Sequence, residues 1–465
     1  MRTAGREAMS QNERTKDVPL SQWPEIQLTR RQMMQRLAAL GLALPSAAAI
    51  LEACGGENAP AVTALSKDTT GSISIWGWKD SLSALKLVDA DFSAAYPKVT
   101  FKYVERPPAE TYRNIQLAIA AGSGAPDVAL IEDSHLPQYV HLGALADITD
   151  WVKPYVSKIV TYKWNWTKKS NRYYAMPWDP GPVAVFYRRD VFQKAGVDPT
   201  SIQTWEDFYQ AAKTIKQKTG AFMWQQAKAR NDGRLLETLL WQRGTGYIDK
   251  SGNVVLDKDT KVQSTLEYIG RFWTDGLAAD QEPWTDPWYK GQSGGTTATV
   301  IDAVWMGTFF KSFIAPKATG SWGVFMLPVW EAGGSRASND GGSVLAIFDQ
   351  SSQKDAARAY VEFHLGRDQS QLLMYQKTDI FPSLKQAFQD PFFQEADPYF
   401  GDQKVRMLFA DVAAKIPDAG IYSTDYQQMN SLATPEIQKY ALGQQSAQQA
   451  LANAARLIRE RTHRS

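Results

Sequence analysis

The sequence predicts an α/β protein built from two lobes, and three observations support this prediction. The chain has 465 residues, more than one hydrophobic core normally supports. Residues 72–131 alternate between strand-like and helix-like hydrophobic patterns, which is typical of an open parallel sheet covered by helices. The segment Tyr173–Gly196 contains Pro177, Pro180 and Pro182, which fix φ and remove backbone donors. It is therefore expected to be a stiff, extended crossing between the lobes.

Residues 72–131 supply the elements of the predicted parallel sheet. Strands are expected at 72–78, 99–104 and 127–131, separated by helices around 85–95 and 112–119. The strand at 127–131 is continuously apolar, as expected for a strand buried on both faces. Ligands bind beyond the carboxyl ends of strands in such sheets. Here those ends carry Trp78 and Asp80, Glu105, and the run Glu132–His135.

The elements after the crossing are less regular. Thr204–Asp207 forms a capping box, and the amphipathic pattern after it predicts a helix that reaches Ile215. Pro283–Gly295 is expected to be a loop that bears three aromatic residues. Further helices are expected at 235–241, 262–273, 354–365, 369–376 and 447–458, and further strands at 296–301, 322–327 and 344–348.

The composition excludes several classes of function. Lys and Arg number 51 against 49 Asp and Glu, so the small net charge of +2 does not favour nucleic acid as a partner. One cysteine excludes an intramolecular disulfide, and four histidines make a His-rich metal site improbable. No cofactor is expected. The 16 tryptophans and 19 tyrosines fit either core packing or flat surfaces for a ligand.

The N-terminal segment has the features of an export signal. The apolar run 37–51 is shorter than the roughly 20 residues that span a bilayer, but it suits a signal segment. The Thr29–Met34 stretch before it resembles a twin-arginine export signal. Leu51–Cys54 resembles a lipoprotein cleavage box, although Glu52 departs from the usual small residue. We expect a signal segment at 1–53, lipidation of Cys54, a tether at 54–71, and an exported protein held at the outer face of the cytoplasmic membrane or in the periplasm.

Five stretches of the chain together carry a resemblance to a known family. They are AAGSGAPDVALIEDSHLPQYVHLGALADIT (120–149), RYYAMPWDPGPVAVFYRRDVFQKAGVD (172–198), TWEDFYQAAKTI (204–215), a glycine-led strand ending in Trp (294–305), and GGSVLAI with the Ala-rich helix after it (341–363). In their order and spacing the chain resembles the extracellular solute-binding proteins of family 1, which include maltose-binding protein and serve ATP-driven sugar importers.

The resemblance implies the two-lobe periplasmic-binding-protein fold, type II-like, with hinge crossings and a ligand cleft between the lobes. It places the N-lobe at 72–179 and 343–402 and the C-lobe at 180–342 and 403–462, with crossings near 180, 342 and 402. It also implies a monomeric binding protein rather than an enzyme. The expected partners are a carbohydrate ligand and the permease subunits of an ABC transporter with their ATPase.

The resemblance also suggests which residues bind the ligand. Sugar recognition uses flat aromatic faces together with planar polar groups. Residues that match family positions are Trp78, Asp80, Glu105, Asp133, Ser134, Trp178, Asp179, Trp305, Asp340 and Gly341. The far lobe offers further candidates in Trp224, Trp284, Trp288 and Tyr426. Core packing is the alternative for each tryptophan, a helix cap or turn for Asp133 and Asp340, and a hinge turn for Asp179.

Two other functions remain as alternatives. An exported glycoside hydrolase would need two carboxylates at a defined separation, drawn from Glu105, Asp133, Asp179 and Asp340, and nothing in the sequence defines such a pair. A binding protein for glycerol phosphate or a polyamine is the second alternative. A phosphate ligand predicts clustered Arg, Lys or backbone donors, whereas the candidates here are mostly Trp and Asp, so a sugar is favoured.

Overall fold

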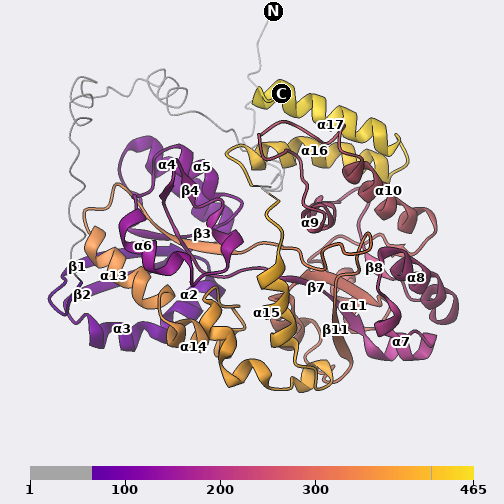
Figure 1. Cartoon of the computed structure of the whole chain (residues 1–465), viewed down its shortest axis with the longest axis horizontal. Coiled ribbons are helices and arrows are strands. Elements are labelled where there is room, and N and C mark those ends of the chain that lie inside the picture. The colour runs from indigo at the N-terminus through magenta and orange to yellow at the C-terminus, as the bar shows by residue number, and fades with distance from the viewer. Residues whose placement is uncertain (1–64, 420–421) are drawn as a thin grey trace, which may run out of the picture.

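The computed structural model describes residues 65–419 and 422–465, which form two lobes with separate sheets (Figure 1). The N-lobe sheet has the order β2-β1-β3-β12-β6. Its strands are β1 (Gly71–Gly77), β2 (Val99–Glu105), β3 (Val128–Glu132), β6 (Met176–Pro177) and β12 (Ser343–Ile347). β1 pairs in parallel with β2 and β3, as predicted, whereas β12 is antiparallel to β3 and β6. The sheet is therefore completed by a strand from a distant part of the chain.

Helices cover the N-lobe sheet. They are α2 (Lys79–Leu85), α3 (Asp89–Ala95), α4 (Pro108–Ala121), α5 (Leu136–His141), α6 (Thr149–Val156), α13 (Lys354–Leu365) and α14 (Asp368–Thr378). α4 ends at Gly122, whose φ of 72° is the left-handed conformation that glycine adopts without steric cost. The predicted strand-helix-strand-helix-strand pattern is confirmed, with the helix expected around 85–95 divided into α2, a short 3₁₀ turn and α3.

The C-lobe is organised around β7 (Val183–Arg188), which is buried along its whole length. β10 (Thr299–Ala303) and β11 (Trp322–Met326) pair with it on either side, both antiparallel. β8 (Trp224–Gln225) and β9 (Ala278–Ala279) form a short parallel pair nearby. The helices of this part of the chain are α7 (Arg189–Ala195), α8 (Trp205–Thr219), α9 (Arg234–Gln242), α10 (Thr260–Thr274), α11 (Asp286–Ser293), α12 (Met306–Phe309), α15 (Val405–Lys415), α16 (Tyr426–Ala441) and α17 (Ala447–Thr462).

Several helices differ from the predictions. The expected loop at 283–295 contains α11, which begins at an Asp-Pro pair after Thr285, a recognisable helix start that the aromatic and glycine content obscured. The sequence analysis also predicts none of the helices α5, α6, α7, α12, α15 and α16. α16 has Pro435 in its interior, where proline normally signals a break. The predicted capping box of α8 is confirmed, with both hydrogen bonds between Thr204 and Asp207 present.

Two chain crossings between the lobes lie side by side and form a hydrogen-bonded ribbon. Trp178 N donates to Ser343 O (3.0 Å), Asp340 N to Gly181 O (2.9 Å), and Val183 N to Ser338 O (3.0 Å). The first crossing is extended where the prolines lie and runs on into β7, as predicted, but the prediction of an extended segment up to Gly196 is wrong, because Arg189–Ala195 forms helix α7. Because each crossing satisfies the backbone groups of the other, a change in one is transmitted directly to the other.

The last crossing lies near α15. The short 3₁₀ turn at Pro398–Phe400 packs on the C-lobe, because Gly320 N donates to Tyr399 O (3.0 Å) and Tyr399 Oη donates to Ala315 O (2.8 Å). We propose that this crossing occurs before Pro398 rather than near 402. The predicted signal segment, Cys54 and most of the predicted tether lie outside the described residues. Within the described ranges, no helix is long and apolar enough to cross a membrane.

Candidate functional site

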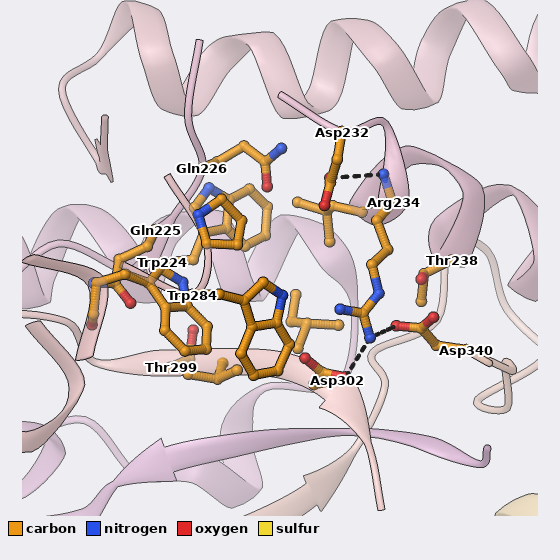
Figure 2. A pocket seen from close by; sticks show the side chains of 15 residues that line it. Trp224, Gln225, Gln226, Asp232, Arg234, Thr238, Trp284, Thr299, Asp302 and Asp340 are labelled. Carbon is orange, nitrogen blue, oxygen red and sulfur yellow. Dashed lines mark hydrogen bonds and ion pairs between the residues drawn. The ribbon is translucent and has the colours of Figure 1, made fainter. Parts of the chain in front are cut away.

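A pocket opens on the C-lobe next to the hinge ribbon (Figure 2). It contains about 600 Å³ of empty space, counting the part open to solvent. β8, the start of α9, the loop before α11 and β10 line it, and Asp340 reaches it from the hinge. Segments far apart in the sequence therefore meet at one hollow at the end of the C-lobe sheet.

Tryptophans form one side of the pocket. Trp284 is 40% exposed and lies near the middle of the view in Figure 2. It stacks on Trp305 with ring centroids 6.1 Å apart and contacts Trp288 at 5.1 Å. Its φ of 64° lies in the left-handed region, which is rare for a bulky side chain and is found preferentially at ligand sites. The pocket thus offers an aromatic face held in an uncommon backbone conformation.

A charged group of three residues forms the opposite side of the pocket. The Nη2 atom of Arg234 lies 2.6 Å from Asp340 Oδ2 and 3.1 Å from Asp302 Oδ1. Figure 2 shows its other terminal nitrogen on the side of the Trp284 indole. The guanidinium carbon lies 4.8 Å from the Trp305 ring centroid, a cation–π distance. Burial raises the pKa of Asp302 to about 7, although the positive charge of Arg234 acts to lower this pKa.

The N-lobe presents a second polar and aromatic face around the end of β3. Tyr112 Oη donates to Glu132 Oε2 (3.0 Å), and its ring stacks on His135 at 3.8 Å. Trp78 meets Tyr112 edge to face at 6.4 Å. Burial raises the pKa of Glu132, and the nearby charge of Asp340 raises it further.

The start of α16 bridges the two lobes. Gln427 Nε2 donates to Ser134 Oγ (3.3 Å), which lies just after β3. Tyr422, ahead of the helix, has its pKa raised first by burial and then by the carboxylates of Asp340, Glu237, Asp133 and Glu132. These four acids come from both lobes and the hinge. The Tyr422 ring also contacts Trp166 of the N-lobe (5.3 Å between centroids) and Trp241 of the C-lobe (5.2 Å), so this tyrosine lies between the two lobes.

Glu237 on α9 lies next to the start of α16 and accepts hydrogen bonds from it. Tyr426 Oη and Asn430 Nδ2, both on α16, donate to its two carboxylate oxygens. Burial raises the pKa of Glu237 to about 7. Among the described residues, no group of three or more His, Cys, Asp and Glu side chains is arranged to hold a metal ion.

Several of the predicted site residues lie at these faces. Asp340 lines the pocket, and Trp305 donates from Nε1 to Asp340 O (3.4 Å) while packing on Arg234. Gly341, at a φ of 72°, passes close to the Trp305 indole. Trp78 and Ser134 are half-buried on the N-lobe face. Among the further candidates, Trp224, Trp284 and Trp288 line the pocket.

Other predicted site residues have structural roles. Asp133 is fully buried and forms an ion pair with Lys163, which is also fully buried. Trp178 is only 1% exposed and belongs to the hydrophobic core, so it has no free face for a ligand. Asp179 accepts hydrogen bonds from the backbone N and the Oγ of Ser343, which is the hinge-turn alternative. We therefore move these three residues from the ligand site to the hinge and its support.

The remaining two predictions find no support in the pocket geometry. Asp80 is exposed in the first turn of α2, and Glu105 is exposed at the end of β2, the edge strand of the N-lobe sheet. Neither residue lines the pocket.

Sequence reasoning missed the charged residues that shape the site. Arg234 and Glu237 lie in a stretch of mixed pattern, and no motif marks them. Asp302 directly follows the strand predicted at 296–301 and precedes Trp305 by three residues, and this position is a usable signal. Glu132 ends β3 directly before Asp133, so the strand end was correctly identified but the neighbouring carboxylate was chosen.

Comparisons with known proteins agree with this architecture. The arabinooligosaccharide-binding protein of Halalkalibacterium halodurans is 27% identical over 303 residues, covering 63% of this chain and 67% of that protein. The lactose-binding protein of Rhizobium radiobacter is 28% identical over 370 residues, covering 76% and 85%. The transporter-associated binding protein of B. animalis subsp. lactis Bl-04, solved with β-1,6-galactobiose, superposes with a TM-score of 0.69 at 26% identity, covering 85% of this chain and 98% of that one.

The family itself follows from a broader match. The sequence profile described as "Bacterial extracellular solute-binding protein" matches residues 78–371, which include the C-lobe sheet, the N-lobe sheet except for β1, the hinge ribbon and the pocket. This match covers more than half of the chain. Together with the two-lobe fold, it shows that this chain belongs to the bacterial extracellular solute-binding protein family.

Proposed function

We propose that this protein binds a sugar or oligosaccharide between its lobes and delivers it to the permease of an ABC transporter. The observation that carries the proposal is the pocket in which the exposed Trp284 faces the Arg234–Asp302–Asp340 group. Indole rings pack against the C–H faces of sugars, and carboxylates accept hydrogen bonds from their hydroxyls. The pocket combines both requirements within one hollow.

The relatives support a carbohydrate as the ligand class. Their names and the bound ligand specify arabinooligosaccharide, lactose and β-1,6-galactobiose, which are all sugars of more than one unit. They differ from one another in sugar and linkage. They therefore support the class of ligand for this chain without selecting a particular sugar.

The geometry does not favour the alternatives. A phosphate ester requires clustered cationic donors, but Arg234 is the only cationic residue that lines the pocket, and two carboxylates hold it. A glycosidase requires two free carboxyl groups across one bond, and Asp133, one of the candidates, is buried in an ion pair. Membership of a solute-binding family agrees with a protein that binds its ligand without converting it.

Lobe closure supplies the mechanism of delivery. In the closed form that we propose, Trp284 and Trp305 of the C-lobe contact the ligand from one side, and the N-lobe face around Trp78 and Glu132 contacts it from the other. A ligand that contacts both faces binds the closed form more tightly than the open form, and this difference in affinity drives closure. The permease would then recognise the closed arrangement of the two lobes.

A carbohydrate screen followed by mutation tests the function. A thermal-shift panel of mono- and oligosaccharides, confirmed by calorimetry, should identify at least one sugar that binds. Trp305→Ala should weaken the binding of that sugar by about 30-fold or more, because a central aromatic contact is lost. Trp151→Ala, at a half-buried tryptophan on α6, is the matched control and should leave affinity unchanged. Equal binding by wild-type protein and Trp305→Ala would exclude the assigned site.

An extracellular solute-binding protein acts outside the cytoplasm. We further propose that Cys54 carries a lipid anchor and that the following residues tether the lobes to the membrane. The position of the only cysteine at the end of the apolar run supports this assignment. Metabolic labelling with palmitate should mark the wild-type protein and not Cys54→Ser. Label retained by Cys54→Ser would rule out Cys54 as the anchor site.

A further inference from the structure

The side chains that line the pocket carry an excess of negative charge. Asp232, Asp302 and Asp340 contribute three acidic side chains, of which Asp302 has its pKa raised to about 7 by burial, and Arg234 contributes the only positive charge among the described residues that line the pocket. The N atom of Arg234 also donates to Asp232 Oδ1 (3.1 Å), which fixes this carboxylate at the start of α9. The pocket therefore offers far more hydrogen-bond acceptors than cationic donors.

The guanidinium of Arg234 has little capacity left for an anionic ligand. Its Nη2 atom is already shared between Asp302 and Asp340, so the two-nitrogen fork that binds a carboxylate or phosphate is not free. An anion bound by two nitrogens would have to displace one of these carboxylates and leave it unpaired, which is strongly unfavourable at a buried position. Asp302 and Asp340 have exposed side-chain fractions of only 8% and 14%.

Further acids surround the pocket, and the cations near them do not offset this charge. Glu132 lies on the N-lobe face and has 41% of its side chain exposed. Glu237 lies beneath the pocket on α9. Lys163 is fully buried and paired with Asp133. Lys79, next to Trp78 on the N-lobe side, is exposed and is followed directly by Asp80. Acidic side chains therefore lie on the N-lobe face as well as around the C-lobe pocket.

We propose, on the basis of the sugar-binding function above, that the cleft selects sugars by charge: it accepts neutral sugars and protonated amino sugars and excludes uronic acids and sugar phosphates. Hydroxyl and ammonium groups donate hydrogen bonds to the carboxylates that line the pocket. A carboxylate or phosphate on the ligand meets like charges in a partly desolvated space, where repulsion is stronger than in water.

Matched ligands test this selection directly. Cellobiose, cellobiouronic acid and chitobiose in its free-amine form share one β-1,4 linkage and differ in charge. Galactose, galacturonate and galactosamine form a second such set. Calorimetry at low ionic strength gives the dissociation constant of each sugar. For every set in which the neutral or amino sugar binds, its dissociation constant should be at least 30-fold lower than that of the acidic counterpart. The ratio should shrink in 0.5 M salt, because added ions screen the repulsion.

Charge-neutralising variants separate this effect from a general loss of binding. Glu132→Gln and Asp302→Asn should each lower the ratio of acidic to neutral dissociation constants by about tenfold, even where affinity for every sugar falls. A purely structural role of either residue would change both constants equally and leave the ratio unchanged. Asp355→Asn, at an exposed acid in the first turn of α13, is the matched control and should not alter the ratio.

The outcomes distinguish this proposal from the function on which it rests. An acidic sugar that binds as tightly as its neutral partner overturns charge selection and leaves the sugar-binding function intact. An unchanged ratio in both variants also overturns it, because the named carboxylates would then not be responsible. If no sugar of any charge binds, including the wider neutral panel, the proposed function and charge selection both fail.

Discussion

Replacing Arg234 by alanine is expected to abolish sugar binding, with an affinity loss of more than about 100-fold. The substitution removes the nitrogen that faces Trp284 and the cation that packs on Trp305. It also leaves Asp302 and Asp340, which share Arg234 Nη2, without their counter-charge. Removing one partner of such a pair costs about 3–5 kcal/mol when the remaining charge stays buried. Calorimetry with the sugar found in the screen gives the measurement.

Arg230→Ala is the matched control for this prediction. Arg230 lies four residues earlier, and its side chain is 67% exposed and pairs with Glu282 at 3.5 Å. Exposed pairs contribute at most about 1 kcal/mol, so this variant should bind like wild type. Arg234→Lys should be intermediate, because it retains the charge but loses the planar fork. If Arg234→Ala binds the sugar as well as Arg230→Ala, the charged side of the pocket is not part of the ligand site.

Gly181→Ala is expected to reduce both stability and affinity, because it disrupts the ribbon between the lobes. A Cβ at this position would lie 2.0 Å from the backbone O of Asp340, far inside van der Waals contact. Neither crossing can move away easily to make room for the Cβ, since Asp340 N donates to Gly181 O at 2.9 Å and holds the two segments together. We expect a loss of about 3 kcal/mol in the free energy of unfolding, at the upper end for overpacking. Affinity falls as well, because the Asp340 side chain is displaced from Arg234.

Gly307→Ala provides the comparison for this substitution. Gly307 is buried in α12, and a Cβ there would approach Phe400 only to 3.4 Å, an ordinary contact. Alanine also has the higher helix propensity, so this variant should keep wild-type stability and affinity. Denaturant unfolding and calorimetry on both variants give the two readouts. Wild-type stability in Gly181→Ala would show that the two crossings are not held in register as the ribbon requires.

The N-lobe elements could be predicted because their signals are local. Alternation in β1 and β2, the apolar run of β3 and the glycine that ends α4 each act within a few residues. The capping box of α8 is equally local, since Thr204 and Asp207 satisfy each other's backbone donors. Pro435 inside α16 shows the limit of such signals, because tertiary packing overrides the local preference of proline to end a helix.

The site was only partly accessible from the sequence. Trp305 and Asp340 could be proposed from family positions, and the structure brings both to the charged group that lines the pocket. Trp178 also matched a family position, but the sequence does not indicate which face of a tryptophan remains open. Its burial depends on core residues from several distant elements. An aromatic residue at a hinge thus stayed equally compatible with ligand stacking and with packing until the neighbours were known.

The amino-acid pattern alone determined the order of the N-lobe strands β1, β2 and β3, the extended part of the crossing that ends in β7 and the class of protein, because these depend on periodicity, proline chemistry and motif order. Only the tertiary structure decided which charges share the pocket. Arg234, Asp302 and Asp340 lie far apart along the chain and meet because α9, β10 and the hinge ribbon converge. Such a pairing has no local sequence signal, since the interaction depends on distance in space rather than on spacing along the chain.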